Sequence, residues 1–172
     1  MILTRGLRDD IRWFFYYYIL MKPIKLCLVA STGGPLDQTY LLKGWWQNYN
    51  RFWVTFKKEH ALSLLKDERV YFAYFPEHRN PINAIKNTVL ALKILLQERP
   101  KIIFSPGAGI APPFFFIGKL LGCKLIYLES AAFVNKPSLT GRLVYPLADK
   151  FLIQYKNLKR FYPKADYWGG IL

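Results

Sequence analysis

The sequence contains few acidic residues and few cysteines, and each shortage restricts the partners or sites that the protein can be expected to have. Only 11 Asp and Glu stand against 25 Lys and Arg among 172 residues, which gives a formal net charge of +14. This balance favours anionic partners such as nucleic acid, acidic lipid or phosphorylated substrates. The two cysteines, Cys27 and Cys123, lie in apolar runs without metal-ligand spacing, so we expect reduced, buried thiols and no metal site.

The N-terminal region also lacks a hydrophobic run long enough to span a bilayer. Its most apolar stretch, WFFYYYILM at residues 13–21, falls far short of the ~20 residues that a spanning helix needs. Aromatic side chains favour the headgroup interface, and nearby Arg and Lys suit anionic lipid. We therefore predict that residues 1–22 form a membrane-interfacial helix; the alternative is an extension that the working protein does not need. The predicted lipid contacts here are Trp13, Phe14 and Phe15.

From residue 24 onward, strand-like runs alternate with segments of helical periodicity. The expected strands are 24–30, 51–56, 69–74, 101–105, 124–128 and 150–154. The expected helices are about 36–47, 58–66, a long helix after Pro81, 111–121, about 138–147, and a short helix before Pro163. This alternation predicts one α/β domain over residues 23–172, a Rossmann-like doubly wound parallel sheet with helices on both faces.

Two of the expected helices carry apolar patterns that predict what they contact. In the helix after Pro81, apolar residues at helical spacing predict one buried face. Its members are Ile85, Val89, Leu92 and Leu96. In PPFFFIGKLLG (112–122), three consecutive Phe cannot all point inward, because successive side chains turn by about 100°. We therefore predict that Phe115 and Phe116 contact lipid.

Two glycine turns follow expected strands. ASTGGPLDQ (30–38) follows the first strand, and FSPGAGIAPPF (104–114) follows a later one. Small residues before a helix let backbone N–H groups approach an anion, and the helix dipole adds to this effect. Because ligands of such folds sit at the carboxyl ends of strands, the two turns are expected to frame one cleft.

Several signatures of nucleotide and nucleic-acid binding are missing. Neither turn reads G-x-G-x-x-G, and the second expected strand ends in VTFKK (54–58), where a ribose-binding acid would be expected. No P-loop Gly-Lys-Ser/Thr follows either turn. No RNA-recognition signature is present, so a basic RNA-binding domain is the weaker alternative and we expect no nucleic-acid partner.

Four segments of the chain carry a family resemblance. They are KLCLVASTGGPLDQTYLL (25–42), RFWVTFKKEHALSLLKDERVYFAYFPEHRNP (51–81), SPGAGIAPPFFFIGKLLGCKLIYLES (105–130) and KPSLTGRLVYPLADKFLIQYKNLKRFYP (136–163). In this order they resemble the asparagine-linked glycosylation protein 14 family, which includes PssD-type proteins of bacterial capsule and exopolysaccharide synthesis. The likeness covers about residues 22–170.

The resemblance implies a single half-domain of the GT-B glycosyltransferase fold, the acceptor-side half of a split enzyme. A separate catalytic glycosyltransferase subunit, similar to the C-terminal half, would bind the UDP-sugar donor, so no cofactor is expected in this chain. The pair would add a sugar, with inversion, to a polyprenyl-diphosphate-linked saccharide in capsule or exopolysaccharide biosynthesis. It would work at the cytoplasmic face of the cell membrane, as a peripheral or monotopic protein on an anionic surface. The alternative is a non-catalytic membrane scaffold.

Under this resemblance the glycine turns would hold the acceptor diphosphate. The predicted diphosphate-binding residues are Ser31, Thr32, Gly33, Gly34, Ser105, Gly107, Ala108 and Gly109. Where the family usually has His and Glu in the first turn, this chain has Pro35 and Gln38, and Pro106 replaces a Thr of the second. The loss of the imidazole removes the most plausible proton-transfer group of the first loop.

Further predicted residues lie after other strands and at the C-terminus. Glu129 ends an expected strand and is the predicted catalytic base, with loop bracing as its alternative role. His78, Arg79 and Ser130 are predicted to face the same cleft. ADYWGGIL (165–172) is predicted to dock the partner, unless it packs back on its own sheet. The predicted docking residues are Trp168, Ile171 and Leu172.

Overall fold

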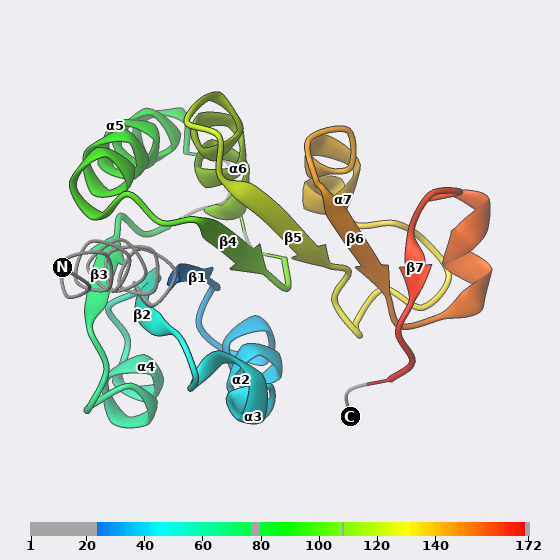
Figure 1. Ribbon diagram of the computed structural model, residues 1–172, viewed down its shortest axis with the longest axis horizontal. Coiled ribbons are helices and arrows are strands. Elements are labelled where there is room, and N and C mark those ends of the chain that lie inside the picture. Colours follow the sequence, from blue (N-terminus) through cyan, green and yellow to red (C-terminus); the bar gives the residue numbers. More distant parts are fainter. Residues whose placement is uncertain (1–23, 77–79, 108, 171–172) are drawn as a thin grey trace, which may run out of the picture.

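The computed structural model describes residues 24–76, 80–107 and 109–170, which form one parallel sheet of seven strands. The sheet order is β3-β2-β1-β4-β5-β6-β7 (Figure 1). The strands are β1 (Lys25–Val29), β2 (Asn50–Phe56), β3 (Val70–Ala73), β4 (Ile102–Ser105), β5 (Lys124–Leu128), β6 (Lys150–Ile153) and β7 (Asp166–Tyr167). The predicted strands are therefore confirmed within a residue or two, whereas β7 was missed because two residues are too few to show a period.

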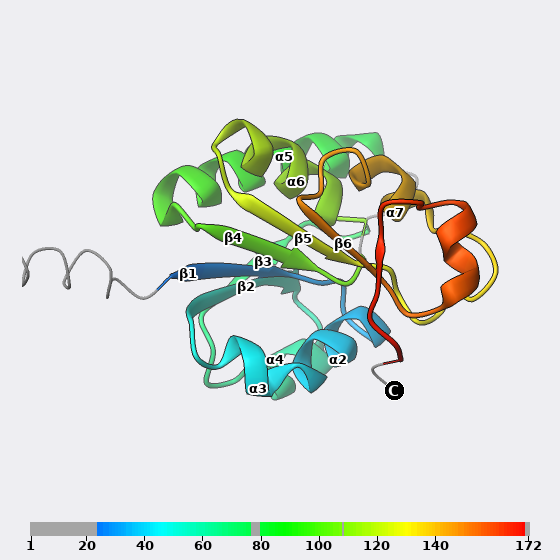
Figure 2. The same cartoon turned by 45° about the vertical axis from the view of Figure 1, so that its right-hand side comes forward.

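Helices cover both faces of this sheet, so the predicted doubly wound α/β class is confirmed (Figure 2). One face carries α5 (Pro81–Glu98), α6 (Ala111–Leu120) and α7 (Leu139–Val144). The other carries α2 (Gly34–Leu41), α3 (Lys43–Trp46) and α4 (Glu59–Leu64). A 3₁₀ helix, η1 (Lys156–Arg160), precedes β7. The helix expected at 36–47 is thus divided into α2 and α3 at Leu42.

The alternation of side chains along the central strand divides the core into two layers. Cys27 and Val29 of β1 point into the layer beneath α5 and α6, and Leu26 and Leu28 point into the layer beneath α2, α3 and α4. All four are fully buried, as expected for a strand that lies between two neighbours in a covered parallel sheet. The second cysteine, Cys123, is also buried, so both are free thiols of the core.

The predicted buried face of α5 is wrong. Its apolar members, Ile85, Val89, Leu92 and Leu96, are 44–66% exposed. The buried face includes Asn83, Asn87 and Glu98.

These polar residues are buried on α5 because two of them, Asn87 and Glu98, form hydrogen bonds with polar groups of β1, of β3 and of the segment after β3. The Asn87 side chain accepts a hydrogen bond from Tyr74 N at 2.8 Å and donates one to Tyr74 O at 3.0 Å. The Glu98 carboxylate accepts hydrogen bonds from Lys25 Nζ at 3.0 Å and Tyr71 Oη at 2.5 Å, and forms an ion pair with Arg69. Buried polar groups need such partners, and this requirement outweighs the apolar periodicity of the helix.

No helix within the described ranges combines the length and the apolarity that a membrane crossing requires. The predicted interfacial helix at residues 1–22, with Trp13, Phe14 and Phe15, lies outside the described residues and stays a prediction.

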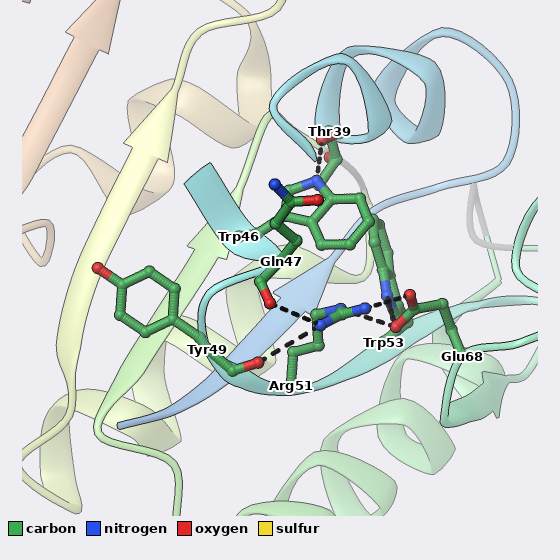
Figure 3. A network of polar contacts seen from close by, with 7 residues as sticks. All are labelled: Thr39, Trp46, Gln47, Tyr49, Arg51, Trp53 and Glu68. Atoms are coloured by element: carbon green, nitrogen blue, oxygen red, sulfur yellow. Dashed lines mark hydrogen bonds and ion pairs between the residues drawn. The ribbon is translucent and has the colours of Figure 1, made fainter. Parts of the chain in front are cut away.

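A polar network fixes α3 and the start of β2 (Figure 3). Arg51 donates to both carboxylate oxygens of Glu68, from Nε at 2.8 Å and from Nη2 at 2.6 Å. Trp53 Nε1 donates to the same carboxylate at 3.2 Å, and Arg51 Nη1 donates to the carbonyl oxygen of Gln47 at 3.1 Å. The Arg51 guanidinium also lies 4.7 Å from the ring of Trp46. One carboxylate therefore orders an arginine and a tryptophan together.

Replacing Glu68 with alanine is expected to lower the free energy of unfolding by about 2 kcal/mol, because it removes the acceptor of the Trp53 indole and of two of the three Arg51 side-chain nitrogen atoms. Urea unfolding should show a lower midpoint at an unchanged slope. Asp67→Ala, which removes an exposed neighbouring carboxylate, is the matched control. Equal losses for both variants would contradict a specific role for this network.

Candidate functional site

The order of the strands creates a switch point between β1 and β4. From β1 the chain runs outward through β2 and β3, then crosses to β4 on the other side of β1. In open parallel sheets, ligands bind in the crevice beyond the carboxyl ends of the strands at such a point. The two glycine turns follow β1 and β4, so the topology brings them together there.

A cleft of about 590 Å³ lies at this switch point. Ser31 and Thr32 of the first turn line it, together with Gly107 and Gly109 of the second. Both turns therefore contribute residues to one cleft, while Gly33, Gly34 and Ser105 are not among its lining residues. Its remaining lining residues are Pro35, Pro112, Tyr127, Ser130, Ala132, Phe133, Ser138, Leu139, Thr140 and Leu143.

Both turns depend on glycine in a left-handed backbone conformation. Gly33 has φ 93° and Gly107 has φ 95°, values that residues with a Cβ rarely adopt. A Cβ on Gly107 would also lie 3.0 Å from Tyr127 Oη. The Gly107 N–H donates to Ser105 Oγ at 3.2 Å, and Ser105 is fully buried, so this serine shapes the turn from beneath.

Two helices begin at the cleft. Gly33 is the N-cap residue of α2 and makes no side-chain capping bond, and α6 begins with Ala111, Pro112 and Pro113 directly after the second turn. The N-terminal ends of helices carry partial positive charge and free N–H groups, although Pro35, Pro112 and Pro113 supply no N–H here. No described residue that lines the cleft is formally charged, so these ends and the hydroxyl groups are its means of attracting an anion.

Glu129 lies beneath the cleft rather than in it. Its side chain is fully buried, and both carboxylate oxygens accept hydrogen bonds. Oε1 accepts from Ser130 N at 3.2 Å, and Oε2 accepts from Ser138 N at 3.3 Å and from Tyr162 Oη at 2.8 Å. Of the two roles predicted for Glu129, the geometry favours loop bracing, because the carboxylate holds the loop between β5 and α7 in place.

Gln38 ties the first turn to the same loop. Its amide oxygen accepts from Ala131 N at 3.2 Å and from Gln154 Nε2 at 3.1 Å, and its amide nitrogen donates to Ser130 Oγ at 3.3 Å. Gln154 Nε2 also donates to the carbonyl oxygen of Glu129 at 3.0 Å. The side chain that replaces the family's usual Glu is therefore buried and joins three segments of the chain.

Two tyrosines lie near Glu129, and one of them, Tyr162, donates a hydrogen bond to its carboxylate. Burial and the Glu129 charge raise the pKa of Tyr127 and of Tyr162 well above the usual range of a phenol. Both hydroxyls therefore stay protonated at neutral pH. Tyr127 Oη lies 3.3 Å from Ser138 Oγ, which in turn accepts the N-cap hydrogen bond of α7 from Gly141 N at 2.8 Å.

Sequence reasoning missed one wall of the cleft, which is formed by Tyr127, Phe133, Ser138, Leu139, Thr140 and Leu143. The available signal was the serine before LTGRLV, since Ser is a preferred N-cap residue and marks the start of α7 beside the loop after β5.

The predicted lipid contacts on α6 separate into one buried and one exposed residue. Phe115 is fully buried and packs edge-on against Tyr127, with ring centroids 5.9 Å apart, so the prediction that it contacts lipid is wrong. Phe116 is 51% exposed. The rotation of α6 on the sheet, which the sequence alone does not fix, decides which Phe points outward.

At the C-terminal end, Trp168 donates its backbone N–H to the carbonyl oxygen of Ile153 at 2.9 Å and remains 62% exposed. It lies at the rim of an apolar hollow on the α3 side of the sheet, together with Trp45, Phe104 and Leu152. Its role in docking stays a prediction.

The other predicted residues that lie outside the described ones are His78, Arg79, Ala108, Ile171 and Leu172. The described residues contain no cluster of three potential metal ligands.

Comparison with known proteins identifies relatives of this fold. The chain superimposes on MurG of Acinetobacter baumannii with a TM-score of 0.66 at 19% identity, over 78% of this chain and 43% of MurG. It is 41% identical over 84 residues to the UDP-N-acetylglucosamine transferase subunit ALG14 of Candida albicans, and 32% identical over 153 residues to that of Debaryomyces hansenii. These matches cover 45% and 73% of this chain, and span 38% and 66% of the two relatives.

A family model also matches directly. The model described as "Oligosaccharide biosynthesis protein Alg14 like" matches residues 70–171, which contain the second glycine turn, the Glu129 loop and the whole of α5 to β7. With its half-domain fold and its two glycine turns at the switch point, the chain belongs to the Alg14 family.

Proposed function

We propose that this protein is the acceptor-side subunit of a two-component glycosyltransferase that acts on a polyprenyl-diphosphate-linked saccharide. The observation that carries the proposal is the single cleft shared by the two glycine turns, with the N-terminal ends of α2 and α6 directed to it. A diphosphate suits this arrangement, because backbone N–H groups and helix dipoles bind phosphate without a formal charge.

The sugar-nucleotide site belongs, in this proposal, to a separate catalytic subunit. A GT-B cleft needs two Rossmann-like domains, and the described residues form one sheet. The reported relatives are named UDP-N-acetylglucosamine transferase subunits, which makes UDP-N-acetylglucosamine the first donor to test. The acceptor hydroxyl would displace UDP with inversion. Holding both substrates in one cleft supplies several kcal/mol through orientation alone.

The cellular setting is part of the proposal. We infer that the complex works at the cytoplasmic face of a membrane, with this subunit bound peripherally. The resemblance to PssD-type proteins suggests a capsule or exopolysaccharide product, whereas the description of the matching family model names oligosaccharide biosynthesis. A transfer assay distinguishes the two settings by which lipid-linked saccharide serves as the acceptor.

A non-catalytic scaffold is the second candidate function, and Pro35 and Gln38 favour it. Pro35 offers no proton-transfer group, and the Gln38 amide is occupied by Ser130, Ala131 and Gln154. If Pro35→His and Gln38→Glu leave the transfer rate unchanged, the scaffold role gains support. A large gain in rate would indicate that catalytic chemistry can be restored in this cleft.

The deciding assay measures transfer from a panel of radiolabelled UDP-sugars to membrane glycolipid, with this chain alone, the co-purified catalytic subunit alone, and both together. Transfer that requires both is the expected result. Thr32→Glu places a carboxylate where the diphosphate is expected and should reduce transfer at least about tenfold, with an unchanged affinity for the catalytic subunit. Leu62→Glu on α4 is the matched control. If the mixture never exceeds the catalytic subunit alone, the acceptor-side role is wrong.

A further inference from the structure

The helices α5, α6 and α7 lie on one side of the sheet (Figure 2), and all three carry exposed apolar side chains. On α5 the five members are 44–66% exposed and lie on the side of the helix opposite its buried face. On α6 and α7, Leu120 is 86% and Leu139 75% exposed. We call this set the outer apolar face; its members are Ile82, Ile85, Val89, Leu92, Leu96, Phe116, Leu120, Leu139 and Leu143.

α6 contacts both α5 and α7, so the exposed apolar residues lie on neighbouring helices (Figure 1). Single exposed apolar residues are normal on soluble proteins, whereas a contiguous apolar surface marks an interaction site. The opposite side of the sheet provides the comparison. There α2 and α4 expose only Leu41 and Leu62 among their large apolar residues.

The charges on the two sides of the sheet differ as well. The described residues of α5, α6 and α7 include the exposed bases Lys86, Lys93, Lys119 and Arg142, of which Lys119 is paired with Asp149 at 3.1 Å. Their one acidic residue, Glu98, is buried and paired with Lys25 and Arg69. By contrast, α2, α3 and α4 on the opposite side carry the acids Asp37 and Glu59 beside one lysine, Lys43.

We propose that the outer apolar face is the surface with which this protein lies on a bilayer containing anionic lipid. Apolar side chains that enter the acyl boundary, bordered by lysine and arginine, are the combination that binds such an interface. Lys86 and Lys93 lie seven residues apart along one side of the α5 stripe, and the Lys86 ammonium lies 5.5 Å from the ring of Tyr74, which is 48% exposed. On a bilayer these ammonium groups would turn toward headgroup phosphates while their stems follow the apolar surface.

A second copy of this chain fits the face less well. A two-fold contact through α5 would bring Lys86 and Lys93 of each copy toward the same residues of the other, without an exposed acid on these helices to neutralise them. A bilayer with acidic headgroups supplies the missing negative charge. Charge complementarity therefore favours a bilayer with acidic headgroups over a second copy of this chain.

The face also continues into the cleft. Leu139 and Leu143 of α7 line the cleft and are exposed on the outer apolar face. A polyprenyl chain whose diphosphate lies at the glycine turns would therefore leave the cleft over α7 and pass directly into the bilayer. This link rests on the proposed function, whereas lipid binding by the face does not.

The test uses the full chain with vesicles of phosphatidylcholine, with and without phosphatidylserine. Ile85→Glu with Val89→Glu should reduce binding at least about tenfold, and Lys86→Gln with Lys93→Gln should reduce it about fivefold for each charge removed, only when phosphatidylserine is present. Leu41→Glu with Leu62→Glu is the matched control and should bind like the unaltered protein. Equal effects of the two Glu pairs would overturn the proposal.

A contact measurement keeps the proposal testable when residues elsewhere in the chain also bind lipid. An environment-sensitive fluorophore on Val89→Cys should be quenched by lipids with brominated acyl chains, and one on Leu62→Cys should not, since the native cysteines are buried. No quenching at position 89, or protection of position 89 by dimerisation without vesicles, would overturn the proposal. The Ile85→Glu, Val89→Glu protein should still transfer sugar to detergent-dispersed acceptor. Loss of vesicle binding can therefore be distinguished from loss of the proposed transfer function.

Discussion

Replacing Gly141 with alanine is expected to cost about 3 kcal/mol or more of folding stability and to reduce sugar transfer at least about tenfold. A Cβ at this position would overlap the Glu129 carboxylate, and would lie 2.6 Å from Tyr162 Oη and 2.9 Å from Ser138 Oγ. All three atoms belong to the buried network that holds the start of α7 against the cleft. Because the methyl group has no space to occupy, α7 or the carboxylate must move.

Urea unfolding and the two-subunit transfer assay check this expectation together. Gly44→Ala is the matched control, because no atom lies within 4 Å of the added Cβ and Gly44 is exposed in a helix. Its stability should stay the same or rise by up to about 1 kcal/mol. A Gly141→Ala protein that unfolds at the unaltered urea midpoint would show that the network does not fix the position of α7.

The fold was predictable from the sequence because its signals are local. Each strand of the sheet, apart from the two-residue β7, is a short apolar run bounded by turn residues, and each is followed by helical periodicity. The position of the cleft was predictable for a related reason. Glycine turns after β1 and β4 meet wherever these strands are neighbours, and a right-handed doubly wound sheet makes them neighbours.

What could not be predicted depends on the orientation of whole helices. The apolar stripe of α5 reads as a core face, yet Asn87 and Glu98 are buried because the ends of β1 and β3 need polar partners. No local pattern in α5 reports the needs of residues that are distant in sequence. The same holds for Phe115 and Phe116, since the packing of Phe115 on Tyr127 sets the rotation of α6. Both errors therefore concern how a helix is rotated about its own axis when it packs on the sheet.

Replacing Glu129 with alanine is expected to have the largest effect of any substitution in the cleft loops. It leaves three donors without their acceptor: the N–H groups of Ser130 and Ser138, and the hydroxyl of Tyr162. An unsatisfied buried donor costs about 1–3 kcal/mol, so the loss of stability should reach about 3–5 kcal/mol. Urea unfolding measures it, and Glu59→Ala on the exposed start of α4 is the control for removing a carboxylate.

The Glu129→Gln variant separates a bracing carboxylate from a general base. Glutamine can keep its oxygen toward Ser138 N and Tyr162 Oη, so that only the Ser130 N–H loses its acceptor and the loss should be about 1–2 kcal/mol. If Glu129 braces the loop, transfer falls only in proportion to stability and the pH profile of kcat/KM keeps its shape. If Glu129 removes the acceptor proton, transfer falls by about 10² or more in a protein that is nearly as stable. Full burial and occupied oxygens favour the first result, which would place the proton transfer on the catalytic subunit or on the acceptor's surroundings.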